Sequence, residues 1–147
     1  MQKIILGWLK KLEDELNSIN IEEGRVPAST FFAIRASDNK IVGMINIRHE
    51  LNDNLLRKGG HIGYGVRPTE RSKGYVTKIL YLGIKEAKKL GLEKLLLTSD
   101  KSNIGSVKAI QKNWGVLENE FQEEDEIIQR YWIDVNEALN KGIKTNK

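Results

Sequence analysis

The strongest constraint on the fold is a change of hydrophobic period in the middle of the chain. His61–Arg67 alternates like a strand and is stopped by Pro68, which has no N–H to donate to a sheet. Tyr75–Leu90 then carries apolar residues at helical spacing, and Gly91 is typical of the position just after a helix. Glu93–Thr98 is again a strand, apolar enough to be buried on both faces. The order strand, loop, helix, strand predicts a βαβ unit with two parallel strands and a right-handed crossover.

The neighbouring segments extend this unit to a mixed α/β fold. Thr30–Ala36 and Ile41–Arg48 are rich in aromatic and β-branched residues and flank a polar turn, which predicts a β-hairpin. The stretch His49–Gly60 is polar and irregular, and Ile104–Lys112 predicts a second helix. Val116–Phe121 and Ile127–Ile133 predict a closing antiparallel pair around the acidic turn formed by residues 122–126.

The two ends of the chain carry different patterns. Near the N-terminus apolar residues recur at helical spacing, which predicts an amphipathic helix containing Ile5, Trp8, Leu9, Leu12, Leu16 and Ile19. Residues 134–147 are polar and predict a loose tail. Because no linker or internal repeat interrupts the pattern, we expect residues 1–147 to form a single domain.

Composition excludes several kinds of chemistry. A chain of 147 residues can bury a core of its own, and it contains no cysteine. The missing cysteine excludes a disulfide framework, a thiolate zinc site and a cysteine nucleophile. With only two histidines, His49 and His61, we predict no metal site. No segment has the pattern of a signal peptide or a membrane span, so we expect a cytoplasmic protein.

Charge is distributed unevenly along the chain. Residues 71–112 hold ten basic and three acidic side chains, a net charge of +7, whereas residues 118–137 hold eight acidic and one basic, a net charge of −7. The basic middle predicts that an anion is held there. If the acidic turn at residues 122–126 faces a binding site, a cationic amine is the expected ligand.

Several familiar motifs fail on spacing. Gly63-Tyr64-Gly65 lies inside a strand and would need its third glycine at Pro68, so it is not a dinucleotide fingerprint. The chain contains no Gly-Lys-Ser/Thr and no Gly-x-Ser-x-Gly sequence. His49-Glu50 would need a histidine at Asp53 to form a helical zinc motif.

The loop before the central helix predicts an anion site. A helix start presents unpaired N–H groups and about half a positive charge, and Gly74 lets a ligand approach the backbone closely. Thr77 adds a hydroxyl in the first turn. Cationic side chains surround the loop at Arg71, Lys73 and Lys78. This pattern favours a diphosphate held without a metal, with a basic loop that only caps its helix in solvent as the alternative.

A wider combination of motifs resembles a known family. Arg71-x-x-Gly74-x-Val76 follows a strand ending in Val66-Arg67-Pro68, and Asn103-x-x-Ser106 opens the next helix after a buried strand. Together these resemble the acetyl-coenzyme A loop of the GNAT N-acetyltransferase superfamily. The chain also resembles a bacterial subfamily of predicted acetyltransferases, through residues 26–32, 60–64 and 130–133.

The resemblance implies a centrally splayed β-sheet flanked by helices, with acetyl-CoA as co-substrate. The backbone of Tyr64 and Val66 would pair with the pantetheine arm, and Asn103 with Ser106 would hold the arm from the other side. Arg71 and the N–H groups of the helix start would take the pyrophosphate; the residues implied are Ser72, Lys73, Gly74, Tyr75, Val76 and Thr77.

Four features depart from the family pattern. Val76 stands where the family favours Gly or Ala, and its methyl groups would crowd the pyrophosphate. Ile110 occupies the position that often carries a tyrosine acid, and Trp114 stands where a Gly is usual. Because a helix is the first predicted element, we expect the family's usual first strand to be missing or replaced by another segment.

Acetyl transfer in a chain without cysteine predicts direct attack by an amine in a ternary complex. The Tyr64 N–H is the expected oxyanion donor, and His61 and Glu50 are the candidate bases. A histidine held in a structural hydrogen bond is an equally good interpretation of His61.

The expected acceptor is a primary amine of a small molecule or peptide, and a homodimer is one assembly compatible with the resemblance. A coenzyme-binding relative without transfer activity is the main alternative. A nucleic-acid module is disfavoured because most of the basic residues lie on one amphipathic helix without interleaved aromatics.

Overall fold

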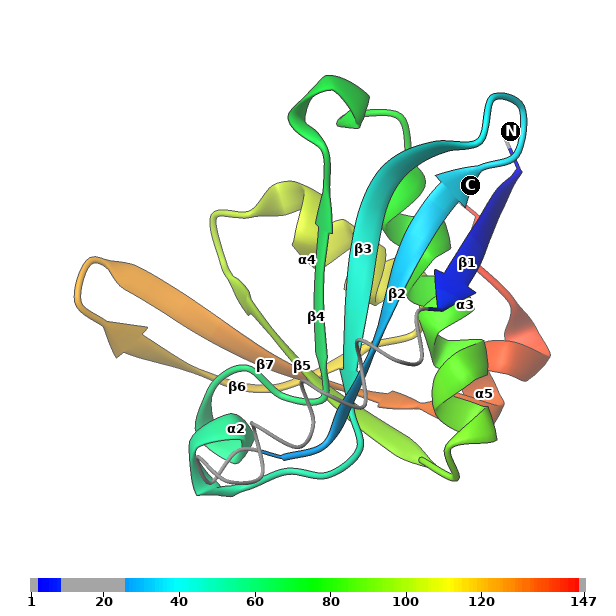
Figure 1. The fold of residues 1–147 in the computed structure, drawn as a ribbon. Helices are drawn as coiled ribbons and strands as arrows, with labels where there is room; N and C mark the ends of the chain where they lie inside the picture. Colours follow the sequence, from blue (N-terminus) through cyan, green and yellow to red (C-terminus); the bar gives the residue numbers. More distant parts are fainter. Residues whose placement is uncertain (1–2, 9–25, 146–147) are drawn as a thin grey trace.

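The computed structural model describes residues 3–8 and 26–145, which contain two antiparallel sheets (Figure 1). The first sheet has the order β1-β2-β3-β4, and the second has the order β5-β7-β6. The strands of the first sheet are β1 (Ile4–Trp8), β2 (Ala28–Arg35), β3 (Lys40–Arg48) and β4 (Ile62–Val66). The strands of the second are β5 (Lys94–Asp100), β6 (Val116–Glu123) and β7 (Glu126–Asp134). The predicted hairpins and the strand that ends before Pro68 are therefore confirmed.

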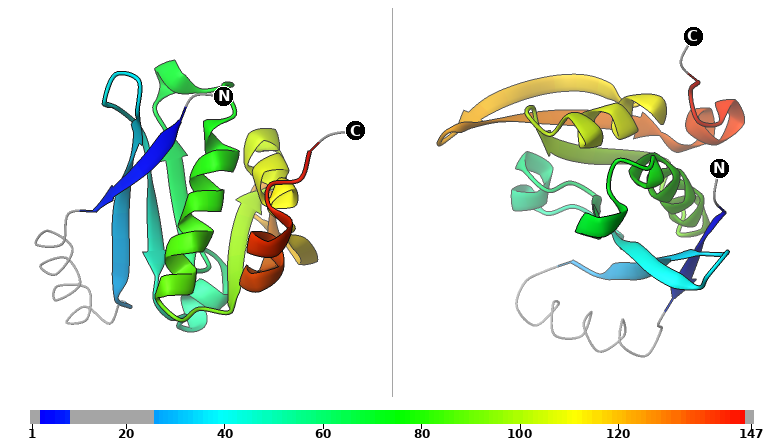
Figure 2. Two further views of the ribbon diagram at one scale, coloured as in Figure 1. Left: turned by 90° about the vertical axis from the view of Figure 1, so that its right-hand side faces the viewer. Right: turned by 90° about the horizontal axis from the view of Figure 1, so that it is seen from above.

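The longest helix covers one face of the first sheet, and the two helices that follow it in the chain lie beside the second sheet (Figure 2). The central helix is α3, which packs its apolar stripe against β1, β3 and β4 on one side and against α4 and α5 on the other. The helical segments are α2 (Asp53–Arg57), the 3₁₀ turn η1 (Pro68–Glu70), α3 (Tyr75–Lys89), α4 (Ile104–Lys112) and α5 (Val135–Lys141). The helices predicted over Tyr75–Leu90 and Ile104–Lys112 are confirmed as α3 and α4. No helix of the described residues is long and apolar enough to cross a membrane.

The core lies between α3 and the two sheets. Ile79 and Leu80 of α3, Ile45 of β3 and Leu95 of β5 are fully buried there. Each such side chain stabilises the fold by roughly 1.5–3 kcal/mol relative to an exposed position. Gly83 allows α3 to approach β3, because a Cβ at Gly83 would lie 2.4 Å from the Ile45 side chain.

The two sheets diverge at β4 and β5, and this corrects the predicted parallel pair. The backbone N–H of His61 donates to the carbonyl of Leu96 at 2.8 Å, and Gly60 forms a bridge with Leu97. Beyond this contact the strands separate, and β5 pairs with β7 instead (Figure 1). Every strand pairing within the described residues is antiparallel. The centrally splayed arrangement is thus present, and it leaves one edge of β4 open.

The N-terminal segment forms a strand where the sequence predicts a helix. Residues 4–8 pair antiparallel with β2, from Ile4 opposite Arg35 to Trp8 opposite Phe31. Ile4 is buried and Ile5 is exposed, as expected for the period of two in a strand. The helix prediction is therefore wrong for residues 4–8, and a first strand is present in the sheet. The remaining residues of the predicted stripe, from Leu9 to Ile19, lie outside the described residues.

The C-terminal segment is also more ordered than predicted. Asp134 caps α5, because its carboxylate accepts from the N–H of Glu137 at 3.0 Å. Val135 and Ala138 are buried against the core. Two apolar residues at helical spacing are too weak a signal within a polar segment, so the predicted loose tail is wrong for residues 135–141.

Candidate active site

A groove of about 990 Å³ opens along the free edge of β4 and the first turns of α3 and α4. Most of the residues predicted for coenzyme binding meet in its lining: Tyr64, Val66, Arg71, Ser72, Gly74, Tyr75, Val76, Thr77, Asn103 and Ser106. The splay of the two sheets therefore brings together three segments that are up to about forty residues apart in sequence. Lys73, His61 and Glu50, which the sequence also predicts for the site, do not line the groove.

The backbone of Tyr64 and Val66 faces the groove. The N–H of Arg48 donates to the carbonyl of His61 at 2.6 Å, and the N–H of Arg67 donates to Val42 at 2.8 Å. In an antiparallel ladder, alternate residues bond to the same partner strand, so residues 61, 63, 65 and 67 bond to β3. The N–H and C=O groups of Tyr64 and Val66 therefore point away from β3. A ligand carrying amides can pair with them as an added strand.

The start of α3 presents backbone N–H groups to the same groove. Gly74 caps the helix in the left-handed conformation, with φ 81°, and Ser72 is left-handed as well, with φ 62°. This winding turns successive N–H groups toward one side, which suits an anion. Arg71 adds an exposed guanidinium, whose Nε donates to the Val66 carbonyl at 3.4 Å.

A buried carboxylate anchors this loop from beneath. Glu70 is 4% exposed and accepts from Arg35 Nη1 at 2.7 Å and from Lys73 Nζ at 2.9 Å. The hydrogen bond from Lys73, with that from Arg35, lowers the pKa of Glu70 to about 2. Lys73 therefore points toward Glu70 and not into the groove, which corrects its predicted role as a phosphate ligand.

The Glu70 contacts predict a specific dependence of stability on pH. The carboxyl group has a folded pKa of about 2 and an ordinary value of 4.5, so between these values the unfolded chain binds more protons. The contacts of Glu70 therefore contribute fully to the free energy of unfolding above pH 4.5, and this contribution is lost as the pH falls toward about 2. We expect the Glu70→Gln variant to bind up to about one proton less on unfolding in this range. Urea unfolding from about pH 5 to about pH 2 measures the slope, and equal slopes for the two proteins would contradict the assignment.

The side chains of Tyr64 and Ser106 join the two walls of the groove. Their hydroxyl oxygens lie 2.7 Å apart, and burial raises the pKa of the Tyr64 phenol to about 12. Asn103 caps α4 through its Oδ1, which accepts from the N–H of Ser106 at 3.2 Å. Asn103 and Ser106 thus hold the start of α4 beside β4, in addition to lining the groove.

The Tyr64–Ser106 hydrogen bond predicts an energetic coupling between the two side chains. Tyr64→Phe and Ser106→Ala each remove the same hydrogen bond. The free energy of unfolding lost in the double variant should therefore be smaller than the sum of the losses in the two single variants. We expect a coupling of about 0.5–1.5 kcal/mol in the free energy of unfolding. Chemical denaturation of the four proteins measures it, and strictly additive losses would show that the bond does not stabilise the groove.

His61 makes a structural hydrogen bond. Its ring is 7% exposed, and Nδ1 accepts from the N–H of Leu96 at 2.9 Å. Burial, together with the positive charge of Arg48, lowers the pKa of the imidazole. The neutral ring then carries its proton on Nε2 and uses its lone pair on a backbone group. The structural interpretation of His61 is favoured over its role as a base.

The other sequence candidates occupy distinct places. Glu50 is exposed beyond the end of β3 and outside the groove. Ile110 is fully buried in the core, so no hydroxyl can be offered from that position. Trp114 is left-handed, with φ 69°, and its indole N–H donates to the Gly142 carbonyl at 2.7 Å. Trp114 thus attaches the end of the chain to α4.

Sequence reasoning missed several residues of the lining. Lys108 and Lys112 of α4 border the groove, and their spacing of four on a helix was a usable signal for a cationic wall. Arg48 also lines the groove, but it comes from β3, which no motif connected with the site. The pairing of β3 with β4 brings Arg48 to the groove.

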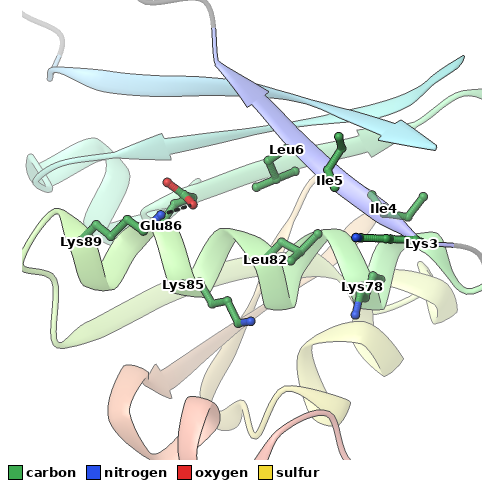
Figure 3. Close-up of a pocket in the computed structure, with 9 residues that line it drawn as sticks. All are labelled: Lys3, Ile4, Ile5, Leu6, Lys78, Leu82, Lys85, Glu86 and Lys89. Carbon is green, nitrogen blue, oxygen red and sulfur yellow. Dashed lines mark hydrogen bonds and ion pairs between the residues drawn. The ribbon is translucent and has the colours of Figure 1, made fainter. Parts of the chain in front are cut away.

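A second groove, of about 550 Å³, lies between β1 and α3 (Figure 3). It is lined by apolar residues of both elements and by four lysines, Lys3, Lys78, Lys85 and Lys89. Glu86 pairs with Lys89 at 3.1 Å across its rim. Lys78 belongs to this groove and not to the first one, so it does not supply the charge that the sequence predicted for the anion site.

One carboxylate of the acidic turn, Glu123, is already paired with cations. Glu123 accepts from Arg57 at 2.9 Å and from Lys58 at 2.6 Å, both in the segment of α2. These contacts lower the pKa of the Glu123 carboxyl group, with the bond from Lys58 the larger cause. The part of the turn that reaches toward the first sheet is therefore already paired with cations.

Splayed sheets, an open strand edge and a left-handed helix start that faces it are the architecture of an acyl-CoA-dependent N-acyltransferase. The model of the acetyltransferase (GNAT) family matches residues 5–116. The chain belongs to the GNAT acetyltransferase family, whose members transfer an acetyl group from acetyl-CoA to an amine.

Solved structures show the same fold. A spermidine/spermine N-acetyltransferase from Vibrio cholerae, solved in mutant forms, is 16% identical, with a TM-score of 0.69 over 95% of this chain and 99% of that one. The spermidine N-acetyltransferase of Vibrio cholerae in complex with CoA and spermine is 16% identical, with a TM-score of 0.70 over 93% and 98%. A ribosomal-protein-S5-alanine acetyltransferase from Vibrio fischeri is 17% identical, with a TM-score of 0.63 over 84% and 69%. No curated protein matches the sequence significantly.

Proposed function

We propose that this protein acetylates a primary amine of a small molecule or peptide by direct attack on acetyl-CoA in a ternary complex. The observation that carries the proposal is the groove itself, in which the free edge of β4 and the left-handed start of α3 face the same space. An extended chain of amides that ends in a diphosphate matches this order of groups.

Different residues of the groove would bind different parts of the coenzyme. The backbone groups of Tyr64 and Val66 would hold the pantetheine amides, and Asn103 at the start of α4 would face them. The N–H groups from Ser72 to Thr77 would bind the pyrophosphate, with Arg71 as the neighbouring cation. Lys108 and Lys112 add positive charge along the same wall. Val76 is half-buried and packs against the core, and its N–H remains in the helix start.

The coenzyme supplies an activated acetyl group. The amine nitrogen forms a bond to the thioester carbon, and the carbon–sulfur bond breaks. The sulfur leaves with the bonding electron pair as a thiolate, and the amine nitrogen loses a proton. The chain's part is to orient the groups and to stabilise charge. The Tyr64 N–H is the proposed oxyanion donor, since it faces the groove. A thiol with a pKa of about 8.5 gives a workable thiolate leaving group without a proton from an acid. Turnover is therefore compatible with a buried Ile110 at the position that often carries a tyrosine acid.

Neither of the two bases predicted from the sequence is available in the groove. His61 uses its lone pair on Leu96, and Glu50 stands outside. We therefore propose that the amine enters already neutral or loses its proton to water. This assigns the rate enhancement to positioning and not to general base catalysis.

A two-part experiment tests this proposal. Calorimetry measures acetyl-CoA binding, and release of free thiol measures turnover across a panel of amines. We expect binding together with turnover of at least one amine. Binding without turnover on any amine would support the alternative, a coenzyme-binding relative that does not transfer. Failure to bind acetyl-CoA would overturn the proposal as a whole.

A further inference from the structure

One cation at the junction of the two sheets has no acidic partner within the described part of the chain. Arg48, the last residue of β3, is half-buried, and its Nη1 donates to the carbonyls of Gly59 at 3.2 Å and Gly60 at 3.0 Å. None of the ion pairs between described residues involves Arg48. Burial lowers the pKa of this guanidinium, and no carboxylate counteracts the effect. A buried charge without a counter-charge is unfavourable in the free protein and becomes favourable when an anion binds.

The side chain of Arg48 lies beside Gly63 of β4. A Cβ at Gly63 would lie 3.6 Å from Arg48 Nη2, and no other contact to that position is closer. Nη1 is occupied by two carbonyls, so the Nη2 edge of the guanidinium is the part that faces the space between the strands. Arg48 consequently lines the coenzyme groove at its end on the side of Gly59 and Ile62.

Arg48 also lines a second cavity, on the face of the first sheet that is away from the helices. Along β3 the residues Ile45 and Ile47 point into the core under α3, so Asn46 and Arg48 point to the opposite face. A cavity of about 430 Å³ lies there, lined by Arg48 together with Asn46, Asn52 and Asn54. Its polar lining consists of amides and this one cation, with no acidic residue among the described ones.

The position of Arg48 separates it from the phosphate site. The helix start follows Val66, whereas Arg48 pairs with His61 at the opposite end of β4. The length of β4, Ile62–Val66, corresponds to about 16 Å of strand. A pyrophosphate bound at Gly74 therefore cannot neutralise Arg48. No carboxylate of the described residues supplies the counter-charge, and a molecule that enters at the other end, which in the proposed reaction is the acceptor, can supply it.

We propose that Arg48 binds a carboxylate on the acceptor, so that the substrate is a small molecule carrying both an amine and a carboxylate, such as an amino acid. The guanidinium offers a planar set of donors that matches a carboxylate, and the surrounding amides add neutral hydrogen-bonding partners. The inference rests on the proposed function, because it names the substrate class of the same site. It names a different substrate from the cationic amine that the acidic turn suggested; within that turn, Glu123 is already paired with Arg57 and Lys58.

The test compares matched acceptors in the wild-type protein. Each L-amino acid is paired with its amide and with its decarboxylated amine, and both binding to the CoA-loaded protein and thiol release from acetyl-CoA are measured. We expect at least one amino acid to bind about 10- to 100-fold more tightly than its amide, the amount associated with a charge-assisted hydrogen bond. Equal binding of acids, amides and decarboxylated amines would overturn the proposal.

Variants then assign the preference to one side chain. Arg48→Gln should abolish the discrimination between acid and amide, and Arg48→Lys should retain part of it because the charge remains. Arg57→Gln, which removes an exposed guanidinium paired with Glu123, is the matched control and should retain the full preference. Discrimination that survives in Arg48→Gln would overturn the assignment. Thermal melting reports whether Arg48→Gln is folded, and if it is not, the wild-type series decides alone.

Three further outcomes separate this inference from its alternatives. If Arg48→Gln weakens succinyl-CoA relative to acetyl-CoA and leaves amino acids unaffected, the carboxylate belongs to the acyl group and the acceptor assignment is wrong. If amino acids bind through Arg48 without thiol release, the carboxylate site stands and the proposed transfer fails. If amines without a carboxylate are acetylated equally well, the transfer stands and the carboxylate site fails.

Discussion

The Gly74→Asp variant is expected to bind acetyl-CoA about 100-fold more weakly than the Gly74→Asn variant. Asparagine and aspartate have nearly the same size, and both tolerate the left-handed conformation that Gly74 adopts with φ 81°. Both are also favourable at a helix N-cap, so the free energy of unfolding should be similar for the two proteins. The difference between them is one negative charge at the proposed pyrophosphate site.

Calorimetric titration with acetyl-CoA measures this difference, and thermal melting checks that the two variants are equally folded. A comparable loss in both variants would mean that the added side chain blocks the groove by its size. Equal affinity of both variants and the wild-type protein would show that no phosphate lies at the start of α3.

The Gly60→Ala variant is expected to lower the free energy of unfolding by about 3 kcal/mol. Gly60 adopts a left-handed conformation, with φ 64°, at the point where the two sheets meet. A Cβ there would lie 2.2 Å from the carbonyl oxygen of Leu96, so the backbone of β5 would have to move. The hydrogen bond from His61 to that same carbonyl would be weakened with it.

Gly91→Ala is the matched control for this prediction. Gly91 is also left-handed, with φ 83°, but nothing lies within 4 Å of the position that its Cβ would take. We expect a loss of only about 1 kcal/mol, which is the conformational cost alone. Urea denaturation measures both variants. If their losses are equal, the contact between β4 and β5 does not depend on the close approach at Gly60.

The local elements of the central region could be read from their patterns. The stripe of α3, its start after Gly74 and its end before Gly91 all follow from residue types within a few positions of one another. The same holds for α4 between Asn103 and Asn113. Such signals are local because hydrogen bonds inside a helix, and the groups that cap its ends, involve neighbours in sequence.

The errors occurred where pairing partners decided the outcome. Residues 4–8 carry apolar side chains that suit a helix or a strand, and the edge of β2 selects the strand. Residues 135–141 bury only Val135 and Ala138, and the helix depends on packing against α3. The predicted parallel pairing of β4 with β5 failed because the two strands meet only at the contacts of Gly60 with Leu97 and of His61 with Leu96 and then diverge.

For the site, the sequence alone predicted the segment from Arg71 to Thr77 as a phosphate site, because glycine conformation and helix starts are encoded locally. It also determined the fold family, through the order and spacing of its motifs. Only the tertiary structure decided that Lys73 binds Glu70, that His61 bonds to Leu96, and that Arg48 stands in the gap between the sheets. The physical reason is that a side chain's charge is known from its type, whereas its partner depends on strands brought together from distant parts of the chain.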